Sequence, residues 1–142
     1  MRDLLCAIAK EIQELWQTPI GLDLAPSLSG FVIAEDEAVP IALVFNELIL
    51  NGVKHGGQAH GCVRIEAQAG PRSGLVEVRI SNYGQFAPDS AQVKSHRSGL
   101  HLIAALMPSH GARIVREQQG AEVVTLLELE SPIIFQPIKE PT

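Results

Sequence analysis

The stretch that decides the fold is residues 45–56, FNELILNGVKHG. Its apolar residues predict a helix that packs into a core, with polar side chains scattered on a solvated face. Instead Glu47, Asn51, Lys54 and His55 fall at relative positions 0, 4, 7 and 8, close to one line along the helix. Charged pairs at this spacing often only stabilise an exposed face, by a few tenths of a kcal/mol. The alternative is that these four side chains face a ligand. This segment alone does not decide between a solvated face and a ligand-binding face.

The composition is that of one globular domain. The chain has 142 residues, 46% hydrophobic and 19% charged, and this length can bury about two-thirds of the surface of the unfolded chain. No apolar run approaches the roughly 20 residues that cross a bilayer, and the charged residues near the start are atypical of a signal peptide. A cytoplasmic location without direct membrane contact is therefore expected.

The charge and the metal-binding residue types narrow the range of ligands. A net charge of −5 without a basic stripe argues against a nucleic acid partner. Cys6 and Cys62 form no disulfide or metal pattern, and His55, His60 and Cys62 lack both a standard zinc spacing and a fourth ligand. A small anion could still bind where cations and backbone N–H groups converge.

Hydrophobic periodicity predicts an alternation of helices and strands. Helices are expected at residues 3–17, at 36–55 with Asp36 as the N-cap, and at 99–109; strands are expected at 19–25, 62–69, 75–81 and on both sides of a turn at 118–120. Strands that follow one another favour an α+β two-layer sandwich, with a mixed, mostly antiparallel sheet and its helices on one face. The domain is expected to span residues 1–130, followed by an extended or loosely ordered tail at 131–142.

Three further segments favour a ligand site near the end of the central helix. The strand VEVRISNYG ends in Asn82 and Gly84, a hydrogen-bonding side chain followed by a residue that leaves space beside it. Residues 85–98 have no clear period, and loops of that length in a compact domain usually serve a site. Gly99 precedes an apolar helix, whose free N–H groups and positive dipole end favour an anion.

In this order the segments resemble the ATP-binding (Bergerat-fold) domain shared by gyrase, MutL and sensor histidine kinases. NELILNGVKHG looks like the N box of that domain, and its glutamate and its KHG ending are most similar to sensor histidine kinases. ISNYGQF stands where the family has the aspartate-x-glycine-x-glycine G1 box, and SGLHL stands where it has the glycine-rich G2 box. ALMPSHGARI resembles the turn that follows the second box. The resemblance covers about residues 3–130 and implies the Bergerat fold.

The resemblance implies a role for each polar residue of the N box. Asn51 would bind Mg²⁺ through its amide oxygen, a hard neutral ligand for an ion that already shares charge with phosphates. Glu47 would be the catalytic residue, polarising a water or the incoming acceptor or holding a metal-bound water. Lys54 and His55 would face the phosphates or the ribose of ATP.

The resemblance also implies that the first glycine box binds the base. Asn82 would accept a hydrogen bond from the adenine amino group, and Gly84 would leave room for the ring. The family has aspartate at the position of Asn82, and a neutral amide holds a weaker hydrogen bond than a carboxylate, so weaker affinity is expected. Phe86 stands at the second glycine of the box, unless a one-residue deletion shifts the register, and belongs to the implied ATP-binding set.

The second glycine box is implied to bind the phosphates. Backbone N–H groups at the helix start would point at them, and Arg97 and His101, which replace glycines of the family, could add donors. The implied ATP-binding residues of this segment are Arg97, Ser98, Gly99, Leu100, His101 and Leu102.

The implied function is that of a histidine kinase domain that is incomplete alone. It would present Mg-ATP to a histidine on a separate dimerisation and phosphoacceptor domain, which serves a response regulator. None of the histidines lies on the first predicted helix, so the chain is expected to be either an excised domain or one that acts on a partner in trans. Its expected location is the cytoplasm, including as the cytoplasmic part of a membrane-bound sensor. Trp16 on that helix is expected to pack in the core or against another domain.

Two alternatives remain open. A stand-alone serine kinase of the anti-sigma-factor type shares the fold and this length, although such proteins start with a strand and this chain starts with a helix. A degenerate nucleotide-binding or docking module without turnover would account for the departures from the glycine motifs.

Overall fold

The computed structural model describes residues 1–55, 63–84 and 99–137. Within these ranges no helix combines the length and the apolarity that crossing a bilayer demands. The elements are, in chain order, α1 (Arg2–Trp16), β1 (Ile20–Leu24), the 3₁₀ turn η1 (Pro26–Leu28), β2 (Val32–Ile33), the 3₁₀ turn η2 (Glu35–Glu37), α2 (Ala38–His55), β3 (Val63–Ala69), β4 (Val76–Tyr83), α4 (Gly99–Leu106), β5 (Ala112–Gln119), β6 (Glu122–Leu129) and β7 (Ile134–Phe135).

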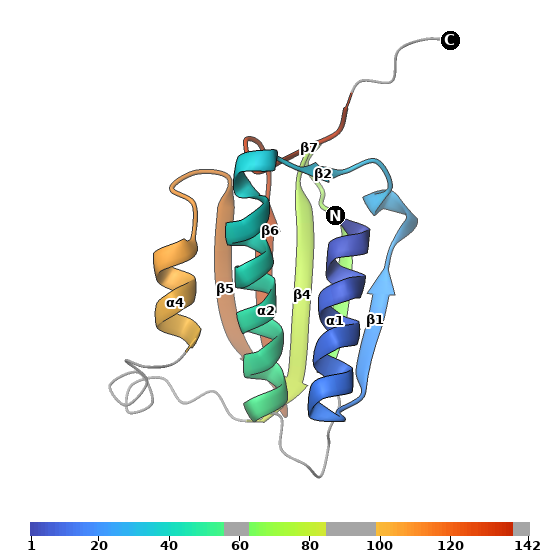
Figure 1. Cartoon of the computed structure of the whole chain (residues 1–142), viewed down its shortest axis with the longest axis vertical. Helices are drawn as coiled ribbons and strands as arrows, with labels where there is room; N and C mark the ends of the chain where they lie inside the picture. Colours follow the sequence, from blue (N-terminus) through green and yellow to red (C-terminus); the bar gives the residue numbers. More distant parts are fainter. Residues whose placement is uncertain (56–62, 85–98, 138–142) are drawn as a thin grey trace.

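The main sheet has five strands in the order β1-β3-β4-β6-β5. Strand β1 runs parallel to β3, and the other neighbouring pairs are antiparallel. Helices α1, α2 and α4 cover one face of this sheet, with α2 in the middle and α1 and α4 on opposite sides of it (Figure 1). The predicted α+β two-layer sandwich, with a mixed and mostly antiparallel sheet, is confirmed.

The core lies between the sheet and the helices. Alternate residues of a strand point to the same face, and the buried Val76, Val78 and Ile80 of β4 form such a set. Phe45 and Ile49 of α2 are fully buried against them in the same hydrophobic cluster. Burying each such side chain contributes about 1.5–3 kcal/mol, which explains why α2 is apolar over most of its surface.

The start of α2 differs from the sequence prediction. Asp36 was expected to cap the helix, but it lies within the 3₁₀ turn η2, and α2 begins at Ala38. Three consecutive acidic residues, Glu35 to Glu37, occupy that turn, where negative charge is favourable next to the positive end of the helix dipole. Pro40 falls in the first turn of α2, where its missing N–H has no intrahelical role.

The region after β6 packs more closely than expected. Residues 131–142 were expected to be an extended or loosely ordered tail, of which 138–142 lie outside the described residues, and Ile133 and Ile134 are fully buried in the core. Ile134 and Phe135 form β7, which pairs antiparallel with β2, and this two-stranded sheet was not predicted. A single Pro-rich segment shows no strand alternation, so only the tertiary packing reveals it.

Two smaller predictions concern the helices. Helix α4 ends at Leu106, three residues before the predicted end at residue 109. Trp16 has 48% of its surface exposed and its neighbour Leu15 has 73%, so Trp16 is not a core residue, and its packing against another domain stays a prediction. The buried stripe of α1 consists of Leu5, Ala9 and Ile12, so the final turn of the helix extends beyond the core.

Candidate functional site

One end of the sandwich brings three of the predicted site segments together. The C-terminal end of α2, the C-terminal end of β4 and the beginning of α4 lie at the same end of the molecule (Figure 1). Helix α4 packs against α2 and buries Ile103 in the core. Asn51, Asn82 and Gly99 belong to these three segments, so the structure gathers them at one end as the sequence predicted.

Asn51 is the most unusual polar side chain at this end. It is only 5% exposed, and its Nδ2 has no hydrogen-bond partner in the described part of the chain. A buried amide without a partner costs about 1–3 kcal/mol, so proteins rarely retain one unless a ligand completes its bonding. A ligand atom that accepts this N–H would remove the cost.

Asn82 is also buried, and its orientation is fixed. It is 7% exposed, and its Nδ2 donates a hydrogen bond of 3.1 Å to the carbonyl oxygen of Tyr83. This bond determines which end of the amide carries the nitrogen, a choice that otherwise has to be assigned from the network. The amide oxygen Oδ1 is turned toward α2, where it lies 3.6 Å from the position that a Cβ atom on Gly52 would occupy.

Gly52 connects the two amides, and the sequence analysis missed it. It follows Asn51 on α2, and a Cβ atom there would lie 3.3 and 3.4 Å from the methyl groups of Val63, the register partner of Asn82. Glycine inside a helix costs about 1 kcal/mol relative to alanine, so an interior glycine indicates a close approach. Here it lets α2 lie close to Val63 and to the Asn82 oxygen, and a glycine interrupting an apolar helical pattern was the signal that could have revealed it.

The other N-box residues lie at the surface. Glu47 is half-buried one helical turn before Asn51. Lys54 is exposed, and its Nζ lies 5.9 Å from the centre of the Trp16 ring on α1. Because α1 and α4 flank α2 on opposite sides (Figure 1), this ammonium group extends away from the beginning of α4. His55 ends α2, and only its backbone is described.

The backbone at Gly84 is held by its neighbours. Its N–H donates to the carbonyl oxygen of Ala121 at 3.0 Å, and its own carbonyl accepts from Nε2 of Gln118 at 3.0 Å. Its φ of 150° is a conformation that side chains with a Cβ rarely adopt. Glycine is therefore required here by the backbone as well as by any ligand.

The predicted phosphate-binding segment is only partly described. Gly99, Leu100 and His101 form the first turn of α4, where backbone N–H groups have no intrahelical partners, and only their backbones are described. Leu102 lies beyond these residues with 42% of its surface exposed. Phe86, Arg97 and Ser98 lie outside the described residues.

Two further polar residues lie on the face of the sheet that the helices cover. Thr125 on β6 pairs in register with Ile80 on β4 and with Arg116 on β5. Thr125 is 5% exposed, and Nε of Arg116 donates to its hydroxyl oxygen at 3.3 Å. Burial lowers the pKa of the Arg116 guanidinium because desolvation disfavours the charged form. The sequence analysis missed both residues, although strand alternation in EVVTLLEL could have placed Thr125 on the inner face.

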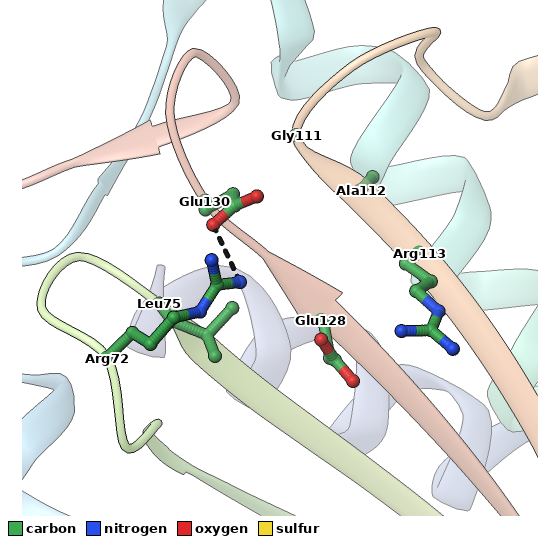
Figure 2. A pocket seen from close by; sticks show the side chains of 7 residues that line it. All are labelled: Arg72, Leu75, Gly111, Ala112, Arg113, Glu128 and Glu130. Carbon is green, nitrogen blue, oxygen red and sulfur yellow. Dashed lines mark ion pairs between the residues drawn. The ribbon is translucent and has the colours of Figure 1, made fainter.

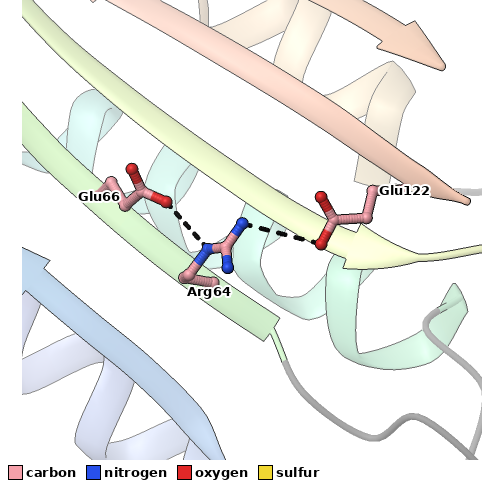
Figure 3. Close-up of polar contacts among 3 residues, drawn as sticks. All are labelled: Arg64, Glu66 and Glu122. Carbon is pink, nitrogen blue, oxygen red and sulfur yellow. Dashed lines mark ion pairs between the residues drawn. The ribbon is translucent and has the colours of Figure 1, made fainter. Parts of the chain in front are cut away.

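The outer face of the sheet carries ion pairs that cross β4. Arg64 on β3 pairs with Glu66 at 2.9 Å and with Glu122 on β6 at 3.7 Å. Since β4 lies between β3 and β6, the second pair crosses it, as Figure 3 shows. Ser81, the register partner of Arg64, is consequently only 2% exposed, and its hydroxyl has no hydrogen-bond partner in the described residues. Half-exposed pairs of this kind contribute at most about 1 kcal/mol.

A separate cavity of about 240 Å³ lies at the opposite end of the sheet. Figure 2 shows its lining, in which Arg72 pairs with Glu130 at 3.0 Å and Arg113 lies near Glu128. Two arginines and two glutamates leave the lining without net charge. Its location at the start of β5 separates it from Asn51 and Asn82.

The residues at the C-terminal end of α2 could supply one ligand to a Mg²⁺ ion whose other ligands come from phosphates and water. They fit this kind of site better than one in which the protein supplies all the ligands. The described residues contain no group of three or more histidine, cysteine or acidic side chains that could hold a metal ion. An asparagine amide is a suitable single oxygen ligand for Mg²⁺, which usually takes its remaining ligands from phosphates and water. Asn51 offers such an oxygen, while its Nδ2, which has no hydrogen-bond partner among the described residues, suits an acceptor on the ligand and not the metal.

Comparisons with known proteins were made at the levels of sequence and structure. No family model and no curated protein matches the sequence. The structure is similar to histidine kinase AdeS of Acinetobacter baumannii (19% identity, TM-score 0.71, covering 92% of this chain and 64% of that one). It is also similar to the catalytic domain of histidine kinase ThkA (17%, 0.70, 92% of each chain) and to the ATP-binding domain of PrrB from Mycobacterium tuberculosis (25%, 0.65, 92% and 93%).

The matches cover different fractions of the other proteins' chains. The chain spans about two-thirds of the AdeS chain but nearly all of the ThkA and PrrB domains. Another structure shows ThkA in complex with the response regulator protein TrrA. This chain has the fold of the ATP-binding catalytic domain of histidine kinases.

Proposed function

We propose that this chain is the ATP-binding catalytic domain of a two-component sensor histidine kinase. It presents Mg-ATP for phosphoryl transfer to a histidine on a separate dimerisation and phosphoacceptor domain. The observation that carries the proposal is the pair of buried amides: Nδ2 of Asn51 has no hydrogen-bond partner among the described residues, and the oxygen of Asn82 is turned toward Gly52. Such amides suit a ligand that offers both a metal-bound phosphate and a base.

Each described residue has a defined task in this proposal. The Asn51 oxygen holds Mg²⁺, which supplies charge neutralisation at the phosphates when bound. The Asn82 oxygen accepts a hydrogen bond from the exocyclic amine of adenine. The N–H groups at the first turn of α4 and the positive end of its dipole stabilise negative charge on the phosphates.

Glu47 is the residue proposed to act on the acceptor. Its carboxylate is half-buried one turn from Asn51, a position from which it could hold the N–H of an incoming imidazole. Attack of the imidazole nitrogen on the γ-phosphorus breaks the bond to the β-phosphate oxygen and releases ADP, and the proton of the imidazole passes to a base such as Glu47. Helix α1 carries no histidine, so the acceptor histidine is proposed to lie on a separate domain.

The proposed partners follow from the same reasoning. The phosphoacceptor domain supplies the histidine, and a response regulator receives the phosphoryl group from it. The complex of ThkA with a response regulator supports the second of these. The serine kinase alternative gains no support, because AdeS and ThkA are both histidine kinases.

Two titrations test the proposal. Mg-ATP is titrated into the wild-type chain and into Asn51→Ala by isothermal calorimetry, with Mg²⁺ and again with EDTA. Binding that requires both Mg²⁺ and Asn51 supports the site, whereas the absence of binding at millimolar Mg-ATP would contradict it. Transfer of label from γ-³²P-ATP to a supplied phosphoacceptor domain then separates a kinase domain from a module that only binds.

A further inference from the structure

Strand β1 is an edge of the main sheet, where it pairs with β3 on one side only. An edge strand presents N–H and C=O groups to which a strand of another chain can add. The N–H of Val63 donates to the carbonyl oxygen of Pro19 at 3.4 Å, and the N–H of Ala25 donates to that of Ala67 at 2.9 Å. Because the direction of these groups alternates along a strand, the odd-numbered residues of this segment bond to β3. The groups of the even-numbered residues point to the open edge: Ile20, Leu22 and Leu24.

Two side chains of α1, which lies alongside β1 (Figure 1), cover part of this edge. Oε1 of Gln13 accepts a hydrogen bond from the N–H of Ile20 at 3.0 Å. Nη1 of Arg2 donates to the carbonyl oxygen of Leu24 at 3.1 Å and to that of the following residue at 3.4 Å. Between these two ends of the strand, the N–H and C=O of Leu22 have no partner in the described part of the chain.

The two covered backbone groups are the ones that a second copy of the chain would pair with each other. In an antiparallel pair of two β1 strands centred on Leu22, this residue lies opposite its own copy, and Ile20 lies opposite Leu24 of the second copy. Residues opposed in this way at the open edge exchange both of their N–H···O bonds. The N–H of Ile20 would therefore donate to the carbonyl oxygen of Leu24 in the second copy, and the reverse by symmetry. Gln13 already occupies this donor, and Arg2 already occupies this acceptor.

The side chains of β1 itself would allow this pairing. The strand IGLDL has neither the lysine nor the proline that protects many edge strands. Its charged residue, Asp23, would lie opposite Gly21 of the second copy, so like charges would not meet. Leu22 is 38% exposed and would pack against its copy at the centre of the pair. We propose that Arg2 and Gln13 close the β1 edge to a second copy of this chain. The inference is independent of the proposed function, because neither residue belongs to the nucleotide site.

Sedimentation velocity of the full chain over a series of concentrations tests the proposal. Pairing breaks both contacts in each copy of the wild-type chain but neither in the double variant Arg2→Ala/Gln13→Ala, so the variant should dimerise at least about tenfold more tightly. The matched control is Arg72→Ala/Gln119→Ala, which removes an exposed arginine and an exposed glutamine away from β1 and should behave as wild type. Association of the Arg2→Ala/Gln13→Ala variant that equals that of the wild type or of the control would overturn the inference.

Two lysine variants separate pairing at the edge from association that follows a loss of stability. Leu22 and Val32 are similarly exposed, at 38% and 40%, and lie in strands of different sheets. In the Arg2→Ala/Gln13→Ala background, Leu22→Lys should restore the wild-type association, because two ammonium groups would meet at the centre of the pair, whereas Val32→Lys should leave the dimer intact. Equal restoration by both lysines, or by neither, would contradict pairing through β1. A wild-type dimer that Leu22→Lys abolishes would show that the edge is open and would also contradict the proposal.

Discussion

The ammonium group of Lys54 lies 5.9 Å from the centre of the Trp16 ring, on the side of α2 that faces α1. A contact of this length at an exposed site contributes about 0.5–1 kcal/mol. The resemblance to sensor histidine kinases implies that the same ammonium group faces the phosphates or the ribose of ATP. We therefore expect Lys54 to leave the aromatic ring when a nucleotide binds.

This exchange predicts a fluorescence signal. Trp16 is the only tryptophan of the chain, so intrinsic fluorescence reports on its surroundings alone. Adding Mg-ATP should change the emission of the wild-type chain, because Lys54 leaves the ring, and most of this change should be lost in Lys54→Met. A constant emission at nucleotide concentrations that calorimetry shows to be saturating would contradict the exchange.

In the described part of the chain, two buried groups have no hydrogen-bond partner, Nδ2 of Asn51 and the hydroxyl of Ser81, and their removal should have different effects on nucleotide binding. Asn51→Leu replaces a buried amide with an apolar group of similar size, so the free energy of unfolding should stay within about 1 kcal/mol of wild type or rise, while Mg-ATP binding is lost. Ser81→Ala should be equally tolerated and should leave binding unchanged, because Ser81 faces the outer side of the sheet. Urea denaturation and calorimetry measure the two effects.

An opposite result for Asn51 would be informative. If Asn51→Leu lowered the free energy of unfolding by several kcal/mol and left nucleotide binding intact, the amide would be a structural core group. The interpretation of α2 as a ligand-binding helix would then be wrong.

Gly52 predicts a steric effect on the same site. A valine at position 52 would crowd Val63 and occupy the space beside the Asn82 oxygen, since the Cβ atom alone would lie 3.3 Å from a Val63 methyl group. Gly52→Val should weaken Mg-ATP binding at least about tenfold and cost about 1–3 kcal/mol of stability through overpacking. Ala42→Val, at a half-buried position of the same helix, controls for the lower helix propensity of valine and should bind normally. Normal binding by Gly52→Val would show that the ligand does not use this space.

The C-terminal segment predicts a stability effect that the sequence analysis did not anticipate. Ile133 is fully buried, so Ile133→Ala should lower the free energy of unfolding by about 2–5 kcal/mol. Phe135→Ala, at a position that is 46% exposed in the same segment, should cost less than about 1 kcal/mol. Thermal denaturation of both variants measures the difference, and equal small effects would place the end of the domain near residue 130.

The sequence predicted those parts of the structure whose signal is local. Alternation in VRIEAQA and VEVRIS fixed the hairpin of β3 and β4, and the apolar helix ending at His55 was visible from its composition. Strand β7 was missed because it is only two residues long, and two residues show no hydrophobic periodicity. Its packing depends on pairing with β2, which lies about a hundred residues earlier in the sequence.

The sequence predicted only those candidate site residues that belong to recognisable motifs. Asn51 and Asn82 stand in recognisable segments, and the structure brings those segments together. Gly52 lies within the N box but has no side chain, and Thr125 and Arg116 lie outside any motif, so only register and helix packing reveal where these residues lie. The contact of Lys54 with Trp16 joins two helices, and periodicity within one helix could not reveal it.

The most direct test of the central claim is a titration followed by nuclear magnetic resonance on ¹⁵N-labelled protein, for which a chain of 15.3 kDa is well suited. The side-chain amide signals of Asn51 and Asn82 should both shift on addition of Mg-ATP and should follow one common dissociation constant. Shifts confined to other residues, or two amides that respond with different constants, would contradict a single nucleotide site between α2, β4 and α4.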